Sequence, residues 1–157
     1  MENKKDSPGV YIPPPLFYVL FFLVAVFIQK RVPIDDSFFH QRWSRFAGVI
    51  FLITALFFLA RSLAQFFNSK NTLILIKPAS SLQSDGIYGI TRNPMYVGLA
   101  FVFLGVTFFI GNWWNIILLP ILLLIVQEYI IKREEKYLER RFGQAYLDYK
   151  MKVRRWL

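Results

Sequence analysis

Hydrophobic residues are grouped along this chain in four long blocks, and polar segments separate the blocks. The blocks cover residues 10–28, 46–67, 94–110 and 113–131. A helix needs roughly 20 residues to cross a bilayer, and each block comes close to that length. Soluble cores are encoded by short periodic stripes instead of such continuous runs. The pattern therefore predicts an all-α, polytopic membrane helix bundle with about four transmembrane helices.

The first two blocks have irregular ends. Arg61 interrupts the second block, so its uninterrupted stretch ends before this residue. The first block opens with three prolines at residues 13–15 and closes with Gln-Lys-Arg at residues 29–31, without the small-residue pattern of a signal cleavage site. We therefore expect the first block to be retained as a span, and residues 1–157 to form a single integral membrane domain.

Two connections between the blocks differ in character. Residues 111–115 make a short uncharged turn that contains Trp113 and Trp114. Tryptophan is typical of the membrane interface, so the last two blocks should form a helical hairpin. Residues 61–92 are the longest polar connection, and loops of that length are usually functional or disordered.

A polar tail follows the last block. A helical pattern continues beyond the block and stops at Gly143, and spaced apolar residues then extend to Trp156. Residues 132–157 are expected to form a cytoplasmic tail, in which the stripe from Tyr146 to Trp156 forms a short C-terminal amphipathic helix on the membrane surface.

Charge indicates the partner and the side of the membrane. The formal net charge is +9, and the tail contains nine Lys and Arg against four Asp and Glu. Basic residues beside a membrane segment attract anionic lipid and mark the cytoplasmic side. We therefore expect a membrane-lipid partner instead of nucleic acid, with the C-terminus in the cytoplasm. The expected location is integral to a membrane, namely a bacterial inner membrane.

The first loop conflicts with a simple four-span topology. An even number of spans puts both termini inside, which sends residues 30–45 outside although they include four Lys and Arg. Acidic residues count little in setting orientation, so Asp35 and Asp36 do not resolve the conflict. A first block that is re-entrant or lies along the interface is the alternative.

The chain has no cysteine and a single histidine, His40. These counts exclude disulfides, thiolate metal sites and cysteine nucleophiles, and they leave no Ser-His or multi-histidine constellation. We therefore expect no metal centre, and we interpret His40 as an ordinary loop residue.

The motif GIYGITRNPMYVG leads into the third block and carries one charge, Arg92. Charge at the edge of a lipid-soluble segment is a candidate functional site. Pro94 is best tolerated in a first helical turn, which puts Asn93 at the capping position beside free N–H groups that attract anions. Tyr96 can stack on a ring, and Gly98 permits close approach of a ligand or a helix. A capped helix with a snorkelling Arg92 is the equally weighted alternative.

A second polar cluster follows the fourth block. Glu128 and Glu135 are two helical turns apart and should face one side, with Glu134 about 100° round the helix. Carboxylates so near the acyl region need a partner, for which Arg92, Arg133 or a cationic ligand are candidates. The alternative for Glu134 and Glu135 is a solvated helix face on which they pair with neighbouring bases, Lys132, Lys136 and Arg140.

Taken in order, the motif GIYGITRNPMYVG, an apolar hairpin and the tail EEKYLERRFGQAYLDYKMKVRRWL resemble the isoprenylcysteine carboxyl methyltransferase family and its phospholipid N-methyltransferase relatives. The family pattern is Arg-His-Pro-x-Tyr-x-Gly at one helix entrance, a Glu-Glu pair after the last span and a Phe-Gly-x-x-Tyr-x-x-Tyr tail. The resemblance extends from near Thr72 onward, and the first two blocks share only hydrophobicity with it.

The resemblance implies an S-adenosylmethionine-dependent membrane methyltransferase that acts at the cytoplasmic face. The implied acceptor is a lipophilic small molecule or prenylated group, such as an isoprenylcysteine-like carboxylate or a related lipid. Arg92 and Glu135 are implied to be catalytic. Asn93 stands where the family has histidine, so no titratable imidazole is available there. The implied cofactor-binding residues are Tyr88, Asn93, Pro94, Tyr96, Gly98, Glu134 and Glu135.

Methyl transfer from a sulfonium depends on positioning and desolvation more than on acid–base help. We hypothesise that Glu134 or Glu135 binds the ammonium of the cofactor, that Asn93 and Tyr96 hold its polar end, and that Arg92 orients an acceptor entering sideways from the bilayer. An amine acceptor would instead give a proton to one glutamate. The alternatives are a membrane sterol-type reductase, for which the chain is short, and a non-enzymatic scaffold or transporter subunit that binds anionic lipid.

Overall fold

The computed structural model describes residues 9–68 and 81–157, and all regular structure within these ranges is helical. Helix α1 (Pro14–Arg31) leads through the short 3-10 helix η1 (Ser37–His40) to α2 (Arg42–Asn68). The predicted all-α class is therefore confirmed for the described residues.

The second half of the chain contains a helical hairpin with one long arm. The 3-10 helix η2 (Gly86–Gly89) precedes α3 (Pro94–Ile110). Helix α4 (Trp113–Ile125) then continues through the π-helical segment η3 (Val126–Ile131) into α5 (Lys132–Phe142).

A last helix, α6 (Gln144–Lys152), turns back after α5. Gly143 separates the two helices with φ of 54°, a backbone conformation that favours glycine. The predicted stop at this residue is therefore confirmed. The position of the tail helices on the membrane surface stays a prediction.

Three helices are long and apolar enough to cross a membrane, namely Pro14–Arg31, Arg42–Gln65 and Trp113–Phe142. Helix α3 is equally apolar in character but has 17 residues. These lengths and compositions agree with the predicted membrane helix bundle in giving three candidate spans, and the count of four spans stays a prediction.

The boundaries of the first two helices differ from those of the blocks. Helix α1 starts at Pro14 and reaches Arg31, beyond the predicted end at residue 28. Helix α2 includes Arg45, which was predicted to lie in the first loop, and it continues through Arg61 without interruption. Both arginines are exposed, so the apolar stem of each side chain can follow the helix while its charge reaches the polar surface.

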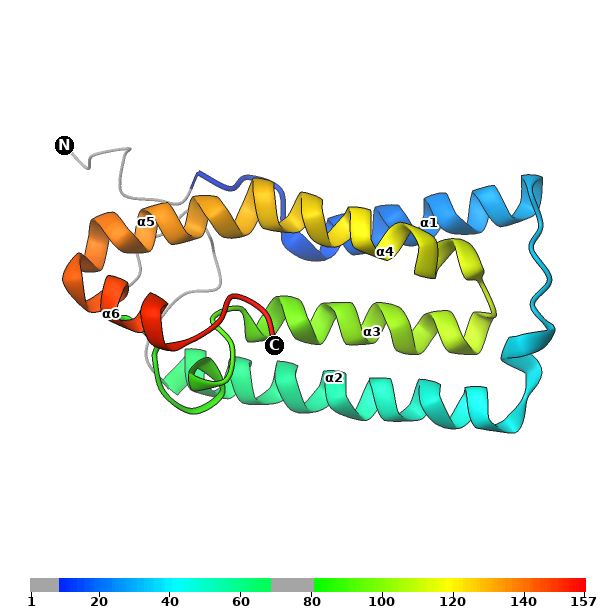
Figure 1. The fold of residues 1–157 in the computed structure, drawn as a ribbon, viewed down its shortest axis with the longest axis horizontal. Coiled ribbons are helices and arrows are strands. Elements are labelled where there is room, and N and C mark those ends of the chain that lie inside the picture. The colour runs from blue at the N-terminus through cyan, green and yellow to red at the C-terminus, as the bar shows by residue number, and fades with distance from the viewer. Residues whose placement is uncertain (1–8, 69–80) are drawn as a thin grey trace.

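Helix α2 packs along α3, and α1 packs along α4, so the long helices form a bundle (Figure 1). Two glycines of α3 make the first of these contacts close. A Cβ atom added to Gly98 would lie 2.7 Å from Leu59 Cγ, and one added to Gly105 would lie 2.6 Å from Leu52 Cδ2. Small residues allow helices to approach in this way in lipid. Of the two roles predicted for Gly98, the structure therefore shows the close helix contact.

We expect Gly105→Ala to destabilise the bundle by about 1 to 3 kcal/mol, the usual range for overpacking a filled core. The new methyl group would meet Leu52 and, at 3.2 Å, the backbone oxygen of Gly48. Denaturant unfolding of the purified protein in micelles, followed by intrinsic fluorescence, measures the effect. Gly89→Ala is the control, because the atom nearest to its Cβ would be Ser84 O at 3.6 Å. Equal stability of both variants would contradict this close packing.

The predicted hairpin of α3 and α4 is confirmed. Its turn is hydrogen-bonded to the connection between α1 and α2. Asn112 begins α4 by accepting a hydrogen bond from the Trp114 backbone N–H at 2.9 Å. The indole of Trp113 donates to Asp35 O at 3.0 Å, and that of Trp114 donates to Val32 O at 2.8 Å. These connections lie at the end of the bundle opposite α5 and α6 (Figure 1).

Candidate functional site

The tail segment, defined as residues 153–157, runs from α6 across the start of α3 (Figure 1). The Arg92 backbone N–H donates to Arg154 O at 2.9 Å. The Thr91 hydroxyl donates to Arg155 O at 3.0 Å. The two polar regions singled out in the sequence are therefore held together by the backbone of the tail segment, for which the sequence predicts only a membrane-surface helix.

Asn93 lies at the predicted N-cap position of α3, and Pro94 occupies the first turn. The Asn93 side chain makes no capping hydrogen bond. It is buried and donates through Nδ2 to Arg155 O at 2.9 Å. Asn93 thus positions the tail segment, and its predicted cofactor contact stays a prediction.

Glu135 is the centre of a buried ionic cluster. Its side chain is 8% exposed, and its Oε1 lies 3.1 Å from Arg92 Nη2. Arg155 binds the same carboxylate in bidentate fashion, with Nε donating to Oε1 at 2.8 Å and Nη2 donating to Oε2 at 2.7 Å. The predicted pairing of Arg92 with Glu135 is therefore confirmed as a contact. A fork of this kind satisfies both carboxylate oxygens, as buried charge requires.

Arg92 retains unused hydrogen-bond donors inside this cluster. Its side chain is 9% exposed. Its Nε and Nη1 atoms are buried, and no hydrogen-bond partner for them is found among the described residues. A guanidinium presents five N–H donors in a rigid fork, and a buried donor without a partner is unfavourable by about 1 to 3 kcal/mol. Arg92 is therefore arranged to accept an additional anionic or polar group.

Glu134 faces a different neighbour from Glu135. The Tyr96 hydroxyl donates to Glu134 Oε1 at 2.7 Å, and Tyr96 is buried on the first turn of α3. Tyr18 of α1 donates to the backbone oxygen of Tyr96 at 3.1 Å and supports this turn. The predicted cofactor residues Tyr96 and Glu134 are therefore brought into direct contact.

Tyrosines from the loop before α3 and from α6 line the same region. The Tyr149 hydroxyl donates to Tyr88 O at 2.7 Å, so the loop bearing Tyr88 is joined to α6. Burial raises the pKa of Tyr88 and of Tyr149, and burial raises the pKa of Tyr146 to about 12. The hydrogen bond to Glu135 raises the pKa of Arg155. The phenols are thus neutral donors, and Arg155 is charged.

Two residues singled out in the sequence lie outside the buried cluster. Glu128 is exposed and pairs with Lys132 at 2.6 Å. The π-helical turns of η3 separate it from Glu135, and a shared side for the two glutamates stays a prediction. Arg133 lies over the Tyr129 ring at 4.3 Å, and no carboxylate within residues 9–68 and 81–157 pairs with it. Of the candidate partners for the buried carboxylate, the structure therefore shows Arg92.

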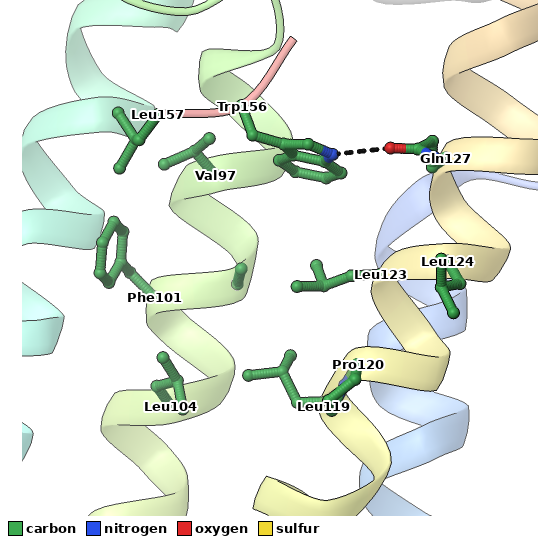
Figure 2. Close-up of a pocket in the computed structure, with 11 residues that line it drawn as sticks. Val97, Phe101, Leu104, Leu119, Pro120, Leu123, Leu124, Gln127, Trp156 and Leu157 are labelled. Atoms are coloured by element: carbon green, nitrogen blue, oxygen red, sulfur yellow. Dashed lines mark hydrogen bonds between the residues drawn. The ribbon is translucent and has the colours of Figure 1, made fainter.

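An apolar groove lies between α3 and α4 (Figure 2). Its volume is about 570 Å³, in the range of sites for small molecules. Trp156 closes one end, and its indole donates to Gln127 Oε1 at 3.0 Å (Figure 2). The remaining lining residues are apolar and come from α3, α4 and the tail segment, among them Val97, Phe101, Leu104, Leu119 and Leu123.

The residues Arg92, Glu135, Arg155, Tyr96 and Glu134 are called the polar cluster here. The groove is separate from this cluster, and the tail segment connects the two. Arg92 and Glu135 are not among the residues that line the groove. Arg155 belongs to the cluster, and the next residue, Trp156, belongs to the groove. Sequence reasoning missed both roles, because the tail offers several basic and aromatic residues without a pattern that separates them. Arg155 was counted only as positive charge, and Trp156 only as part of an apolar stripe.

The polar cluster can bind charge of both signs. Arg92 offers open donors to an anion, and Glu134 accepts a hydrogen bond from Tyr96 at its Oε1 atom. Within residues 9–68 and 81–157, no group of three or more His, Asp or Glu side chains is placed to hold a metal ion. The described arrangement therefore favours chemistry that depends on placing a polar group beside an apolar chain.

Comparison with known proteins places the chain in a family. Residues 43–145 match the sequence model of the phospholipid methyltransferase family, which is more than half of the chain. The chain is 44% identical over 66 residues to an uncharacterized protein of Haemophilus influenzae, a match that covers 40% of this chain and 100% of that protein.

A second relative carries a functional name. The chain is 38% identical over 72 residues to the protein-S-isoprenylcysteine O-methyltransferase of Schizosaccharomyces pombe, a match that covers 46% of this chain and 30% of the yeast protein. No solved structure matches the chain. The family match, the apolar helices and the partial yeast match agree with the resemblance drawn from the motifs. The chain therefore belongs to the phospholipid methyltransferase family of membrane methyltransferases.

Proposed function

We propose that this protein transfers a methyl group from S-adenosylmethionine to the polar end of a lipophilic acceptor, and that it does so at the cytoplasmic face of the membrane. The observation that supports this most directly is the pair of buried, unpartnered donors on Arg92 beside Glu135. An apolar groove lies nearby, so one lipid molecule could place its head at Arg92 and its chain between α3 and α4.

The residues present fit the proposed cofactor. S-adenosylmethionine carries a cationic sulfonium and ammonium together with a carboxylate. Glu135 is a poor partner for that ammonium, because Arg92 and Arg155 already occupy both of its oxygens. Glu134 is the better partner, since its described contact is a single neutral hydrogen bond from Tyr96 at Oε1 and no arginine binds it in the described residues. Of the two glutamates left open by the sequence, we therefore assign the ammonium to Glu134.

When bound, S-adenosylmethionine supplies an electrophilic methyl group. Glu134 holds the positive end of the cofactor, and the Tyr96 hydroxyl keeps this carboxylate in place. Arg92 orients the acceptor through Nε and Nη1 while Glu135 fixes its guanidinium. Placing two reactants in line in a site shielded from water accounts for most of the rate acceleration that such a displacement needs.

The charge of the cluster favours a carboxylate acceptor. Glu135 contributes one negative charge between two arginines, so the three side chains carry a net charge of +1. A carboxylate head complements that charge, and it needs no base because it is already ionised. The family match supports a second candidate, an amine head of a phospholipid. An amine would need a base for its proton, and Glu134 could serve only if it did not also hold the ammonium of the cofactor.

The proposed location follows from the distribution of charge. The tail carries nine Lys and Arg, which favours the cytoplasmic side for α5, α6 and the polar cluster. The tryptophan-bearing turn then lies at the opposite interface. An acceptor that resides in the membrane can reach the groove from the bilayer, because the groove opens between two apolar helices.

Incubation of the purified protein with membrane lipid extract and methyl-labelled S-adenosylmethionine tests the proposal. We expect label in a lipid-soluble product, together with saturable binding of the cofactor in calorimetry. A labelled water-soluble product would contradict entry from the bilayer. Binding of NADPH in place of S-adenosylmethionine would identify a reductase. Binding of neither compound would favour the non-enzymatic scaffold or transporter subunit.

We expect Arg92→Lys to raise the KM for a carboxylate acceptor about tenfold, because lysine keeps the charge and loses the fork that grips a carboxylate. The dissociation constant of S-adenosylmethionine should change less than about twofold, since Glu134 holds the cofactor. N-acetyl-S-farnesylcysteine is a suitable probe acceptor. The control is Arg133→Lys, which alters a side chain that stacks on Tyr129 away from the cluster. Equal KM values for both variants would exclude Arg92 from acceptor binding.

A further inference from the structure

Glu135 is shared unequally by the two arginines of the polar cluster. Arg155 binds it as a fork, with hydrogen bonds of 2.8 Å and 2.7 Å to its two oxygens. Arg92 contacts the same carboxylate through Nη2, which lies 3.1 Å from Oε1. The carboxylate is therefore matched to the guanidinium of Arg155, and Arg92 lies beside it.

The open donors of Arg92 depend on this arrangement. A carboxylate that forms a fork takes two N–H donors of a guanidinium. Nη2 of Arg92 already lies against Glu135, so a fork between these two residues would take Nε or Nη1 as its second donor. Those are the two buried nitrogens for which no partner is found among the described residues. Both nitrogens therefore stay open while Glu135 is turned to Arg155.

The main chains of the two arginines are fixed to each other. Thr91 and Asn93, which flank Arg92, donate hydrogen bonds to Arg155 O at 3.0 Å and 2.9 Å. Glu135 comes from a separate element, α5, so its carboxylate meets two arginines whose relative position is set. The choice of the arginine that it binds as a fork is then made by the side chains.

We propose that Arg155 is a positioning residue for the methyl acceptor, because it occupies both oxygens of Glu135 and so keeps the Nε and Nη1 donors of Arg92 open to an acceptor carboxylate. The inference rests on the proposed function and adds to it a residue that acts through Glu135. The Arg155 side chain is 28% exposed, so its charge stays partly hydrated, whereas the Arg92 side chain is 9% exposed. A guanidinium buried to that extent has the greater need of a further anionic partner.

Binding of a charged and a neutral probe in the absence of cofactor tests this proposal. The full chain in micelles is titrated by calorimetry with N-acetyl-S-farnesylcysteine or with its methyl ester, which lacks the carboxylate charge. We expect the wild type to prefer the carboxylate. Arg155→Lys should weaken carboxylate binding about fivefold and change ester binding less than about twofold, because lysine keeps the charge without the fork and Glu135 then turns to Arg92.

Arg154→Lys is the matched control, because it makes the same change at the neighbouring residue of the tail segment, whose side chain is exposed. Both affinities should stay within about twofold of the wild-type values. Three results would overturn the proposal: equal binding of both probes by the wild type, unchanged carboxylate binding in Arg155→Lys, or an equal loss of both probes in that variant.

A double-mutant cycle distinguishes competition for Glu135 from a loosened tail segment. Arg92→Leu and Glu135→Gln are combined, and denaturant unfolding in micelles gives their coupling as a ratio of unfolding constants. If Arg155 competes with Arg92, this ratio should rise about fivefold when the cycle is repeated in the Arg155→Lys background. A loosened tail segment would lower the ratio, and an unchanged or lower ratio would overturn the proposal.

The outcomes separate this inference from the proposed function. Failure of the wild-type protein to bind S-adenosylmethionine would overturn the methyl transfer. The two probes and the cycle need neither cofactor nor turnover, so they would still decide whether Arg155 keeps Arg92 open.

Discussion

Replacing Glu135 with alanine is expected to lower the free energy of unfolding by about 3 to 5 kcal/mol, the range for removing one partner of a buried ion pair. The substitution leaves Arg92 buried with no anionic partner, and it frees the bidentate fork of Arg155. The tail segment should then lose its fixed position across the start of α3, because its anchoring side chain has nothing to bind.

Denaturant unfolding in micelles measures the loss of stability, and the fluorescence of Trp156 reports release of the tail segment. Glu139→Ala is the control, because its pair with Lys150 is 3.5 Å long and solvent-exposed, and such pairs contribute about 0 to 1 kcal/mol. A double-mutant cycle with Arg155→Leu should show strong coupling to Glu135. Additive effects would show that the cluster is not a cooperative unit.

Replacing Glu134 with glutamine is expected to weaken S-adenosylmethionine binding by about 10- to 100-fold, as expected for loss of a charged hydrogen-bond partner. Glutamine retains an oxygen that can accept the Tyr96 hydroxyl, so the local packing should persist. The free energy of unfolding should therefore change little. The Glu134 substitution is thus expected to lower the affinity for S-adenosylmethionine, whereas Glu135→Ala is expected to lower the free energy of unfolding.

Isothermal titration calorimetry with S-adenosylmethionine measures the loss of affinity, and Glu139→Gln is the matched control at an exposed position of the same helix. An unchanged dissociation constant for Glu134→Gln would remove this residue from the cofactor site. A loss of affinity in Glu139→Gln of similar size would instead point to a general effect of helix charge.

The helices were predictable because lipid imposes a strong requirement on the sequence. Backbone groups in a bilayer must be satisfied within the segment, so long apolar blocks become helices. The block at residues 94–110 coincides with α3, and Pro94 marks its first turn. The meeting of Arg92 with Glu135 was predictable for a related reason, since charges near the acyl region need partners.

Other features depend on tertiary contacts that no local pattern specifies. Asn93 is at the expected N-cap position, but its side chain is turned to donate a hydrogen bond to the Arg155 carbonyl instead of capping the helix. Arg155 resembles the other basic residues of the tail, and only the chain reversal through α6 brings it to Glu135. The π-helical turns between Glu128 and Glu135 were likewise not predictable from the apolar pattern.

The π-helical segment η3 explains how one long helix serves two environments. Helix α4 turns leucines toward the groove, and α5 turns its acidic pair toward Tyr96 and Arg92. A regular helix would keep a single rotational phase along its whole length. The wider turns of η3 change the direction in which side chains face around the helix axis. The apolar half, α4, and the charged half, α5, therefore face different neighbours although the helix is continuous.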